Sequence, residues 1–115
     1  MMKKFISDKN KEEQRLKALA EYRILGTEPE SCYDDVTKIA AATCNVPISL
    51  MTLVDKDRQW FKSKIGLEIN ETRRDWSFCT HAIKENSPLI INDALQDQRF
   101  INNPLVTGDP KIRFY

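Results

Sequence analysis

Residues 46–66 read Val-Pro-Ile-Ser-Leu-Met-Thr-Leu-Val-Asp-Lys-Asp-Arg-Gln-Trp-Phe-Lys-Ser-Lys-Ile-Gly, and this stretch decides the fold. Ile48–Val54 is an almost unbroken apolar run, rich in strand formers and too short for a typical helix. Residues 55–57 predict a turn, and residues 58–65 then alternate between apolar and basic side chains. The pattern predicts a β-hairpin whose first strand lies inside a sheet, covered on both faces, with the second strand nearer the edge. A buried helix followed by a loop is the alternative, and it fits the alternation poorly.

The composition is that of a soluble globular chain of one domain or less. Charged residues make up 30% and apolar residues 41% of the 115 residues. The 18 Lys and Arg nearly balance the 17 Asp and Glu, so we expect neither a nucleic-acid partner nor a membrane surface. No run approaches the roughly 20 apolar residues of a membrane span, and the N-terminus lacks the apolar core of a signal peptide. Three widely separated cysteines favour reduced thiols in a cytoplasmic protein.

The N-terminal part predicts a disordered segment followed by a helix. Residues 1–10 are expected to be disordered, and residues 11–26 to form an N-terminal helix that ends near Gly26. Leu16 and Leu19 give this helix a narrow apolar stripe, which is typical of a helix that contacts a single neighbour. That neighbour is either the rest of this chain or the same helix of a second copy, which would make a homodimer.

A second helix is predicted to start in the segment Thr27-Glu28-Pro29-Glu30 and to end at Asn45, before Pro47. Apolar residues at helical spacing predict the face that meets the sheet, and acidic and basic residues predict the opposite face. The inward set is Tyr33, Val36, Ile39, Ala40 and Thr43, and the outward set is Asp34, Asp35 and Lys38. We interpret Cys32 and Cys44, at the two ends of the helix, as packing residues.

Beyond Gly66 the chain predicts short elements. Residues 66–74 are expected to form a loop, followed by a short helix that Asp75 or Ser77 caps. A third strand is predicted at 88–93 and a fourth at 111–115, with a loop that contains one or two helical turns between them. These strands leave one edge of Ile48–Val54 without an obvious partner. We therefore expect polypeptide beyond Tyr115, or another chain, to complete the sheet.

Several long motifs then occur in order along the chain. They are Leu53-Val54-Asp55-x-x-Arg58-Gln59-Trp60-Phe61-Lys62-Ser63-x-x-Gly66-Leu67, Glu71-Thr72-x-Arg74-Asp75-x-Ser77-Phe78-Cys79-x-His81-Ala82-Ile83, Asp93-Ala94-x-x-Asp97-x-Arg99-Phe100-x-x-Asn103-Pro104-Leu105-Val106 and Ile112-Arg113-Phe114-Tyr115. Residues 12–115 thus resemble bacterial GAF domains of the type that precedes histidine kinase or diguanylate cyclase modules. The resemblance implies an α+β fold: a GAF-like antiparallel sheet with flanking helices, incomplete because the C-terminal strands and helix are missing. Residues 27–115 would be a partial GAF domain, with a pocket under its loops.

Cys79 and His81 are the only close pair of a nucleophile and a base. Residues two apart on a helix diverge by about 200°, so direct activation of the thiol by the imidazole is geometrically poor. One Cys-x-His without a second cluster does not predict a metal site. GAF relatives that reduce free methionine sulfoxide use a cysteine placed like Cys79, but they need another one in a segment that has none here, Asn92–Tyr115.

The resemblance implies a sensory or regulatory domain that binds a small ligand or a partner and that is coupled to an output module outside this chain. Aromatic residues among the candidates either line the ligand pocket or fill the core. The pocket candidates are Trp60, Phe61, Phe78, Cys79, His81, Asp93, Arg113 and Tyr115, with Trp76 as a further aromatic. Arg74 with Asp75, and Asp93 with Arg99 or Arg113, are predicted as ion pairs that fix loops. A thiol-dependent enzyme that uses Cys79 and a dimerisation module without a ligand are the alternatives, and no cofactor is expected.

Overall fold

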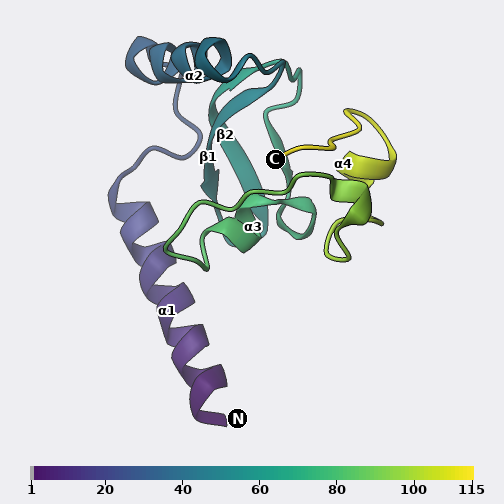
Figure 1. The fold of residues 1–115 in the computed structure, drawn as a ribbon. Coiled ribbons are helices and arrows are strands. Elements are labelled where there is room, and N and C mark those ends of the chain that lie inside the picture. The colour runs from purple at the N-terminus through teal and green to yellow at the C-terminus, as the bar shows by residue number, and fades with distance from the viewer. Residues whose placement is uncertain (1) are drawn as a thin grey trace.

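The N-terminal helix is longer than the sequence predicts. A computed structural model describes residues 2–115, with their side chains from Ser7 onward. Helix α1 (Met2–Glu21) includes most of the segment that was expected to be disordered, and Met1 lies outside the described residues. The helix runs obliquely along one side of the chain, as Figure 1 shows. Residues 22–30, here called the linker, lead from it to the second helix.

The hairpin is confirmed, but its place in the sheet is not. Strands β1 (Ser49–Val54) and β2 (Arg58–Ile65) pair antiparallel, and β3 (Glu71–Arg73) pairs with the other side of β2. The order β1-β2-β3 places the second strand of the hairpin in the middle, so its prediction as the strand nearer the edge is wrong. β3 lies within the predicted loop 66–74. Among the described residues β1 pairs on one side only.

The register changes within the hairpin. Met51 pairs with Ser63 and Thr52 with Phe61, so Lys62 is an additional residue on β2, which is a β-bulge. Gly66 follows directly after β2 at φ +84°, and a Cβ there would lie 2.1 Å from the Pro47 carbonyl oxygen. Only glycine fits this close approach of the chain to the start of β1.

Helix α2 (Ser31–Cys44) lies across the top of the sheet in Figure 1 and ends, as predicted, at Asn45 in the left-handed conformation. It starts later than expected, and most of the predicted inward face is exposed, whereas Asp35 and Lys38 of the outward set are exposed as predicted. Thr37 is its buried residue, whereas Val36 is 51% and Ile39 65% exposed. The interpretation of Cys32 and Cys44 as packing residues is also wrong, because both are exposed.

The C-terminal half consists of short elements: η1 (Arg74–Trp76), α3 (Cys79–Ala82), η2 (Ala94–Gln96) and α4 (Pro104–Thr107). The Ser77 hydroxyl accepts a hydrogen bond from the Thr80 amide, the contact expected of a capping serine, although the residue directly before α3 is Phe78. Residues 88–93 and 111–115 are not regular strands, and that prediction is wrong. They still pair through reciprocal backbone hydrogen bonds between Ile91 and Tyr115, at 2.7 and 2.9 Å.

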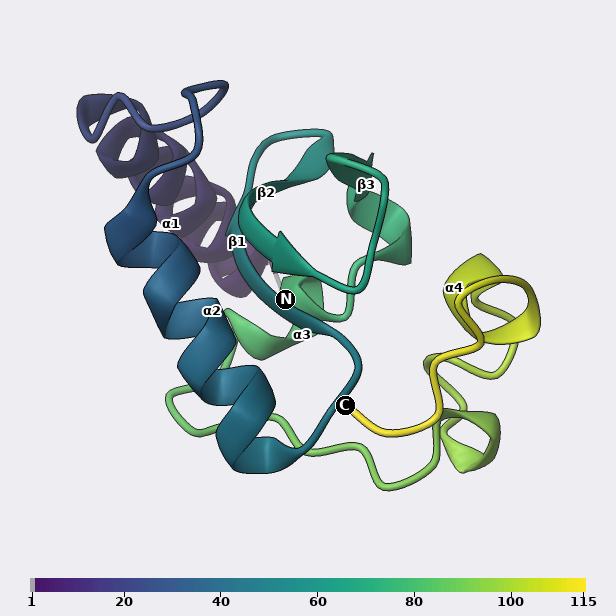
Figure 2. The same ribbon diagram turned by 90° about the horizontal axis from the view of Figure 1, so that it is seen from above.

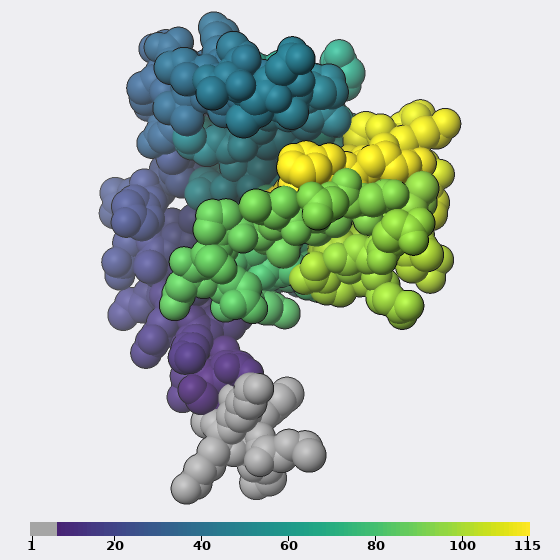
Figure 3. Space-filling view, viewed as in Figure 1, coloured from purple at the N-terminus to yellow at the C-terminus, as the bar shows by residue number. Residues whose placement is uncertain are grey.

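A hydrophobic cluster holds this half together. Its fully enclosed members are Ala94, Phe100 and Val106, and the others are Phe78 and Ile91. Figure 2 shows α2 beside the hairpin and the C-terminal segment, in yellow, on the opposite side. In Figure 3 the green segment after α3 crosses the face toward the viewer. Helices thus flank a three-stranded antiparallel sheet, which agrees with a partial GAF-like α+β fold.

Candidate functional site

A hollow of about 540 Å³ lies between α2, β2 and the linker, and we call it the α2–β2 hollow. Its wall combines two of the predicted pocket aromatics with lysines and small polar groups. The lining residues are Gly26, Thr27, Pro29, Asp34, Thr37, Lys38, Trp60, Phe61, Lys62, Ser63, Lys64, Ile65 and Asn70. Its volume lies in the range of about 300–1,000 Å³ that is typical of small-molecule sites.

The floor of the α2–β2 hollow is a buried polar network. The Ser63 hydroxyl donates to Asp34 Oδ1 (2.5 Å) and lies 2.8 Å from Thr37 Oγ1. Thr37 in turn bonds the backbone carbonyl of Asp34 at 2.9 Å. Thr37 and Ser63 are 2% and 3% exposed, so helix α2 meets the sheet here through hydrogen bonds rather than apolar packing.

Lys62 anchors the linker from the same strand. Its ammonium, 1% exposed, donates to the Thr27 hydroxyl and the Glu28 carbonyl, both at 2.7 Å, and pairs with the Glu30 carboxylate at 2.6 Å. It also lies 5.4 Å from the centre of the Tyr33 ring. The β-bulge allows Lys62 and Ser63, although adjacent, to contact the same side of the molecule. A buried charge with a full set of partners makes this attachment specific.

A second group of predicted residues gathers around Cys79. The Phe78 ring stacks on Phe100 at 4.2 Å and on Tyr115 at 5.0 Å between centroids. The Cys79 sulfur lies 3.1 Å from the Tyr115 hydroxyl and accepts a hydrogen bond from the Thr52 hydroxyl at 3.4 Å. Burial, followed by the neighbouring Cys79, raises the pKa of Tyr115 well above its usual range. The thiol thus joins β1, α3 and the C-terminal segment.

His81 lies apart from this hydrogen-bonded group. Its ring packs edge-on against Phe100 at 5.0 Å, and burial lowers its pKa, with smaller contributions from Lys84 and Arg99. The hydroxyls of Thr52 and Tyr115, and not the imidazole, are the groups that the structure places at the thiol. This arrangement gives Cys79 no histidine base among the described residues.

Asp93 and Arg113 have local structural contacts. Asp93 caps η2 by accepting from the Leu95 amide, and Arg113 donates to the Val106 and Ile112 carbonyls. The prediction that Asp93 pairs with Arg99 or Arg113 is therefore wrong. The acidic partner of Arg99 is Asp97, whose pKa falls to about 2 because Arg99 donates hydrogen bonds to it.

Asp75, predicted to pair with Arg74, pairs instead with the exposed Arg73 at 2.6 Å. The Arg73 guanidinium also lies over the ring of Trp76, 5.4 Å from its centre. Trp76 therefore lies next to a surface cation and is outside the lining of the α2–β2 hollow. This leaves Arg74 available for a partner distant in the sequence.

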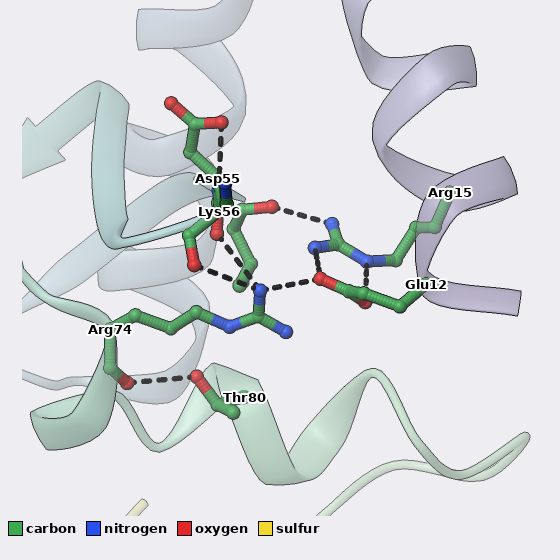
Figure 4. Close-up of polar contacts among 7 residues, drawn as sticks. Glu12, Arg15, Asp55, Lys56, Arg74 and Thr80 are labelled. Carbon is green, nitrogen blue, oxygen red and sulfur yellow. Dashed lines mark hydrogen bonds and ion pairs between the residues drawn. The ribbon is translucent and has the colours of Figure 1, made fainter. Parts of the chain in front are cut away.

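That partner is in α1, where Glu12, Arg15 and Arg74 form a cluster that we call the α1 clamp (Figure 4). Arg15 and Arg74 both bond the Glu12 carboxylate, and Arg15 also donates to the Val54 carbonyl. Arg74 further donates to the carbonyls of residues 55 and 56, both at 3.2 Å. Hydrogen bonds from Arg15 and then Arg74 lower the Glu12 pKa from 4.5 to about 2. The α1 clamp fastens the N-terminal helix to the turn of the hairpin.

The eight predicted pocket residues thus lie in several places. Trp60 and Phe61 line the α2–β2 hollow, and Phe78, Cys79 and Tyr115 form the group around the thiol. His81 packs beside that group, and Asp93 and Arg113 make local backbone contacts. Sequence reasoning missed four polar residues of this site: Asp34 and Lys62 were predicted to point away from the apolar side of their elements, and Thr37 and Ser63 were given no role. The β-bulge on β2, which lets Lys62 and Ser63 contact the same side of the molecule, leaves no signal in the sequence.

The described residues also bear on metal binding and on membrane insertion. No group of three or more His, Cys, Asp and Glu side chains in this part of the chain is placed to hold a metal ion. None of its helices combines the length and the apolar character that a membrane crossing requires.

Comparison with known proteins gives two matches. A family model described as the GAF domain matches residues 28–115. The chain is also 40% identical, over 86 residues, to a cyclic di-GMP phosphodiesterase of Pseudomonas aeruginosa. This similarity covers 75% of the chain but only 15% of the length of that relative.

Proposed function

Because this chain belongs to the GAF domain family, we propose that it is a sensory unit that binds a small ligand in the α2–β2 hollow and transmits binding to α1. The observation that carries the proposal is the composition of the wall. The hollow is lined at once by the sheet, by α2 and by three linker residues, Gly26, Thr27 and Pro29. A ligand there would contact the segment that joins α1 to the rest of the domain.

Binding can act on α1 through differential contacts. The linker is held by Lys62, and α1 is held separately by the α1 clamp. Suppose that the linker has two positions, each with its own position of α1. A ligand that binds one linker position more tightly shifts the equilibrium toward it, and the size of the shift is set by the difference between its affinities for the two positions. The signal then leaves the domain through α1.

The output module is proposed from the relative. The sequence resemblance points to a histidine kinase or a diguanylate cyclase, whereas the relative is a cyclic di-GMP phosphodiesterase. We propose that this domain regulates an output of cyclic di-GMP signalling. The prediction of a homodimer through α1 and the prediction of a cytoplasmic location stay predictions. In the structure Leu19 of the apolar stripe faces a groove toward β1 of its own chain.

Native mass spectrometry of the chain purified from cells tests the ligand site. We expect a small-molecule adduct that dissociates on denaturation. In Lys38→Trp a bulky side chain enters the hollow from the exposed face of α2, and the adduct should be lost. Lys17→Trp, the same change on exposed α1, is the matched control and should keep the adduct. An adduct retained by Lys38→Trp, or absent from the unchanged chain, contradicts the proposal.

A further inference from the structure

The lysines that line the α2–β2 hollow differ in what they can still bind. Lys62 donates to three oxygens of the linker, and Lys64 donates to three oxygens of residues 68–70, at 2.7–3.0 Å. An ammonium has three N–H donors, so both groups are fully engaged. Lys38 of α2 is exposed and has no hydrogen-bond or ion-pair partner within the described residues. It is therefore the lysine that has donors left for a ligand.

The expected partner of Lys38 is Asp34, because side chains four residues apart on a helix lie about 5–6 Å from each other. In this structure the Asp34 carboxylate bonds the sheet instead. The buried Ser63 hydroxyl donates to Asp34 Oδ1 at 2.5 Å and lies 2.8 Å from Thr37 Oγ1. In the part of the chain that the structure describes, no ion pair joins Asp34 to Lys38, and no donor contacts the second carboxylate oxygen of Asp34.

One turn of α2 thus presents a cation and an anion to the hollow, each with capacity for a further hydrogen bond. The apolar part of the lining comes from Trp60, Phe61 and Ile65. A ligand with only a negative charge would pair with Lys38 and be repelled by Asp34, and a ligand with only a positive charge would do the reverse. A molecule that carries both charges close together satisfies both groups.

This inference rests on the ligand site in the α2–β2 hollow. We infer that the ligand is a small zwitterion, with an ammonium and a carboxylate on one carbon and an apolar side chain, as in a free amino acid. Its carboxylate accepts from Lys38, its ammonium donates to the second oxygen of Asp34, and its side chain contacts the aromatic part of the lining. Because both charges are met on α2, binding adds contacts to the helix that directly follows the linker.

Amide chemical shifts measured by NMR on the full chain test the ligand class. The probes are free L-amino acids with apolar side chains, from alanine to phenylalanine. For the tightest binder, the controls are the same molecule without its amino group and the same molecule without its carboxylate. The amino acid should shift the amides of α2 and β2 that border the hollow. Each control should bind about ten-fold more weakly or worse, because it loses one charge-assisted hydrogen bond.

Two variants assign the charges of the ligand to their partners. Lys38→Met should weaken binding of the amino acid about ten-fold without weakening the amine control, which lacks the carboxylate. Asp34→Asn should weaken the amino acid similarly without weakening the acid control, which lacks the ammonium. Asp35→Asn, the same change at an exposed neighbour outside the lining, should bind like the unchanged chain.

Two results would overturn the zwitterion as the ligand. The first is equal binding of the amino acid and of either control. The second is that no amino acid of the panel shifts these amides at millimolar concentration. A native adduct that is lost in Lys38→Trp, together with the second result, would refute the zwitterion and leave the proposed function standing. An adduct that Lys38→Trp retains contradicts the proposed function itself.

Discussion

Replacing Glu12 by glutamine should loosen α1 without disturbing the rest of the fold. The carboxylate is the shared acceptor of Arg15 and Arg74, and Arg74 reaches it across 62 positions of sequence. Glu12→Gln removes the charge that holds the two guanidinium groups together but keeps the size of the side chain. The matched control is Glu13→Gln, the same change at the next residue, which is exposed.

The magnitude follows from the pKa. A fall of the Glu12 pKa from 4.5 to about 2 corresponds to roughly 3 kcal/mol of stabilisation by the charged form. The side chain is 33% exposed, and solvent screening reduces this to about 1–2 kcal/mol. Because the pKa is lower in the folded state, the contribution is complete above about pH 4.5 and is lost as the pH falls toward 2.

Hydrogen exchange of the α1 peptides, followed by mass spectrometry, measures this change. Most of the stability of a helix in a protein comes from its tertiary contacts, so detachment of α1 exposes its amides to exchange. At pH 7, 1–2 kcal/mol corresponds to exchange about 5- to 30-fold faster in Glu12→Gln, while Glu13→Gln stays near the unchanged chain. High salt should narrow the difference. Equal exchange in the two variants would refute the role of the α1 clamp.

Three further predictions concern the fold and Cys79. Lys62→Met should lower the free energy of unfolding in urea by about 2–3 kcal/mol, because it removes the charge-assisted hydrogen bonds that the buried ammonium donates to the linker; a loss below about 0.5 kcal/mol would contradict this. Gly66→Ala should cost about 3 kcal/mol or more, because its Cβ would collide with the Pro47 carbonyl, whereas Gly26→Ala, at a similar φ in open space, should cost about 1 kcal/mol. Equal losses in urea would exclude the collision. Cys79→Ser should leave the background reduction of free methionine sulfoxide unchanged, and a clear loss would favour the thiol enzyme.

The hairpin could be predicted because its signals are local. An apolar run, a polar turn and an alternating run specify two strands and their connection, and Asn45 before Pro47 specifies the end of α2. The third strand could not be predicted in the same way. Glu71–Arg73 is three residues long and charged at both ends, and it is a strand only because β2 pairs with it. Its identity depends on a neighbour and not on its own pattern.

The faces of α2 show where hydropathy misleads. The sequence predicts that Val36 and Ile39 face the sheet, because burial of apolar surface usually decides which side of a helix meets a sheet. Here the strand presents Ser63 to the helix, and Thr37 and Asp34 complete its hydrogen bonds. An interface formed by hydrogen bonds selects the side of the helix that carries Asp34 and Thr37. The sequence of the helix alone cannot reveal which side meets the sheet, since the partner that decides it, Ser63, lies on a bulged strand.

The attachment of α1 follows the same rule and has a functional consequence. Two polar anchors restrain this part of the chain, the α1 clamp on the helix and Lys62 on the linker that follows it. Between the helix and β1 lies a groove of about 520 Å³ rather than a packed core. A helix restrained by a few charged contacts over an unfilled groove can change position at a modest energetic cost, because little apolar contact is lost. Under the proposed function, a ligand in the α2–β2 hollow would act on α1 through these two anchors, whereas a large apolar interface would hold the helix in one position.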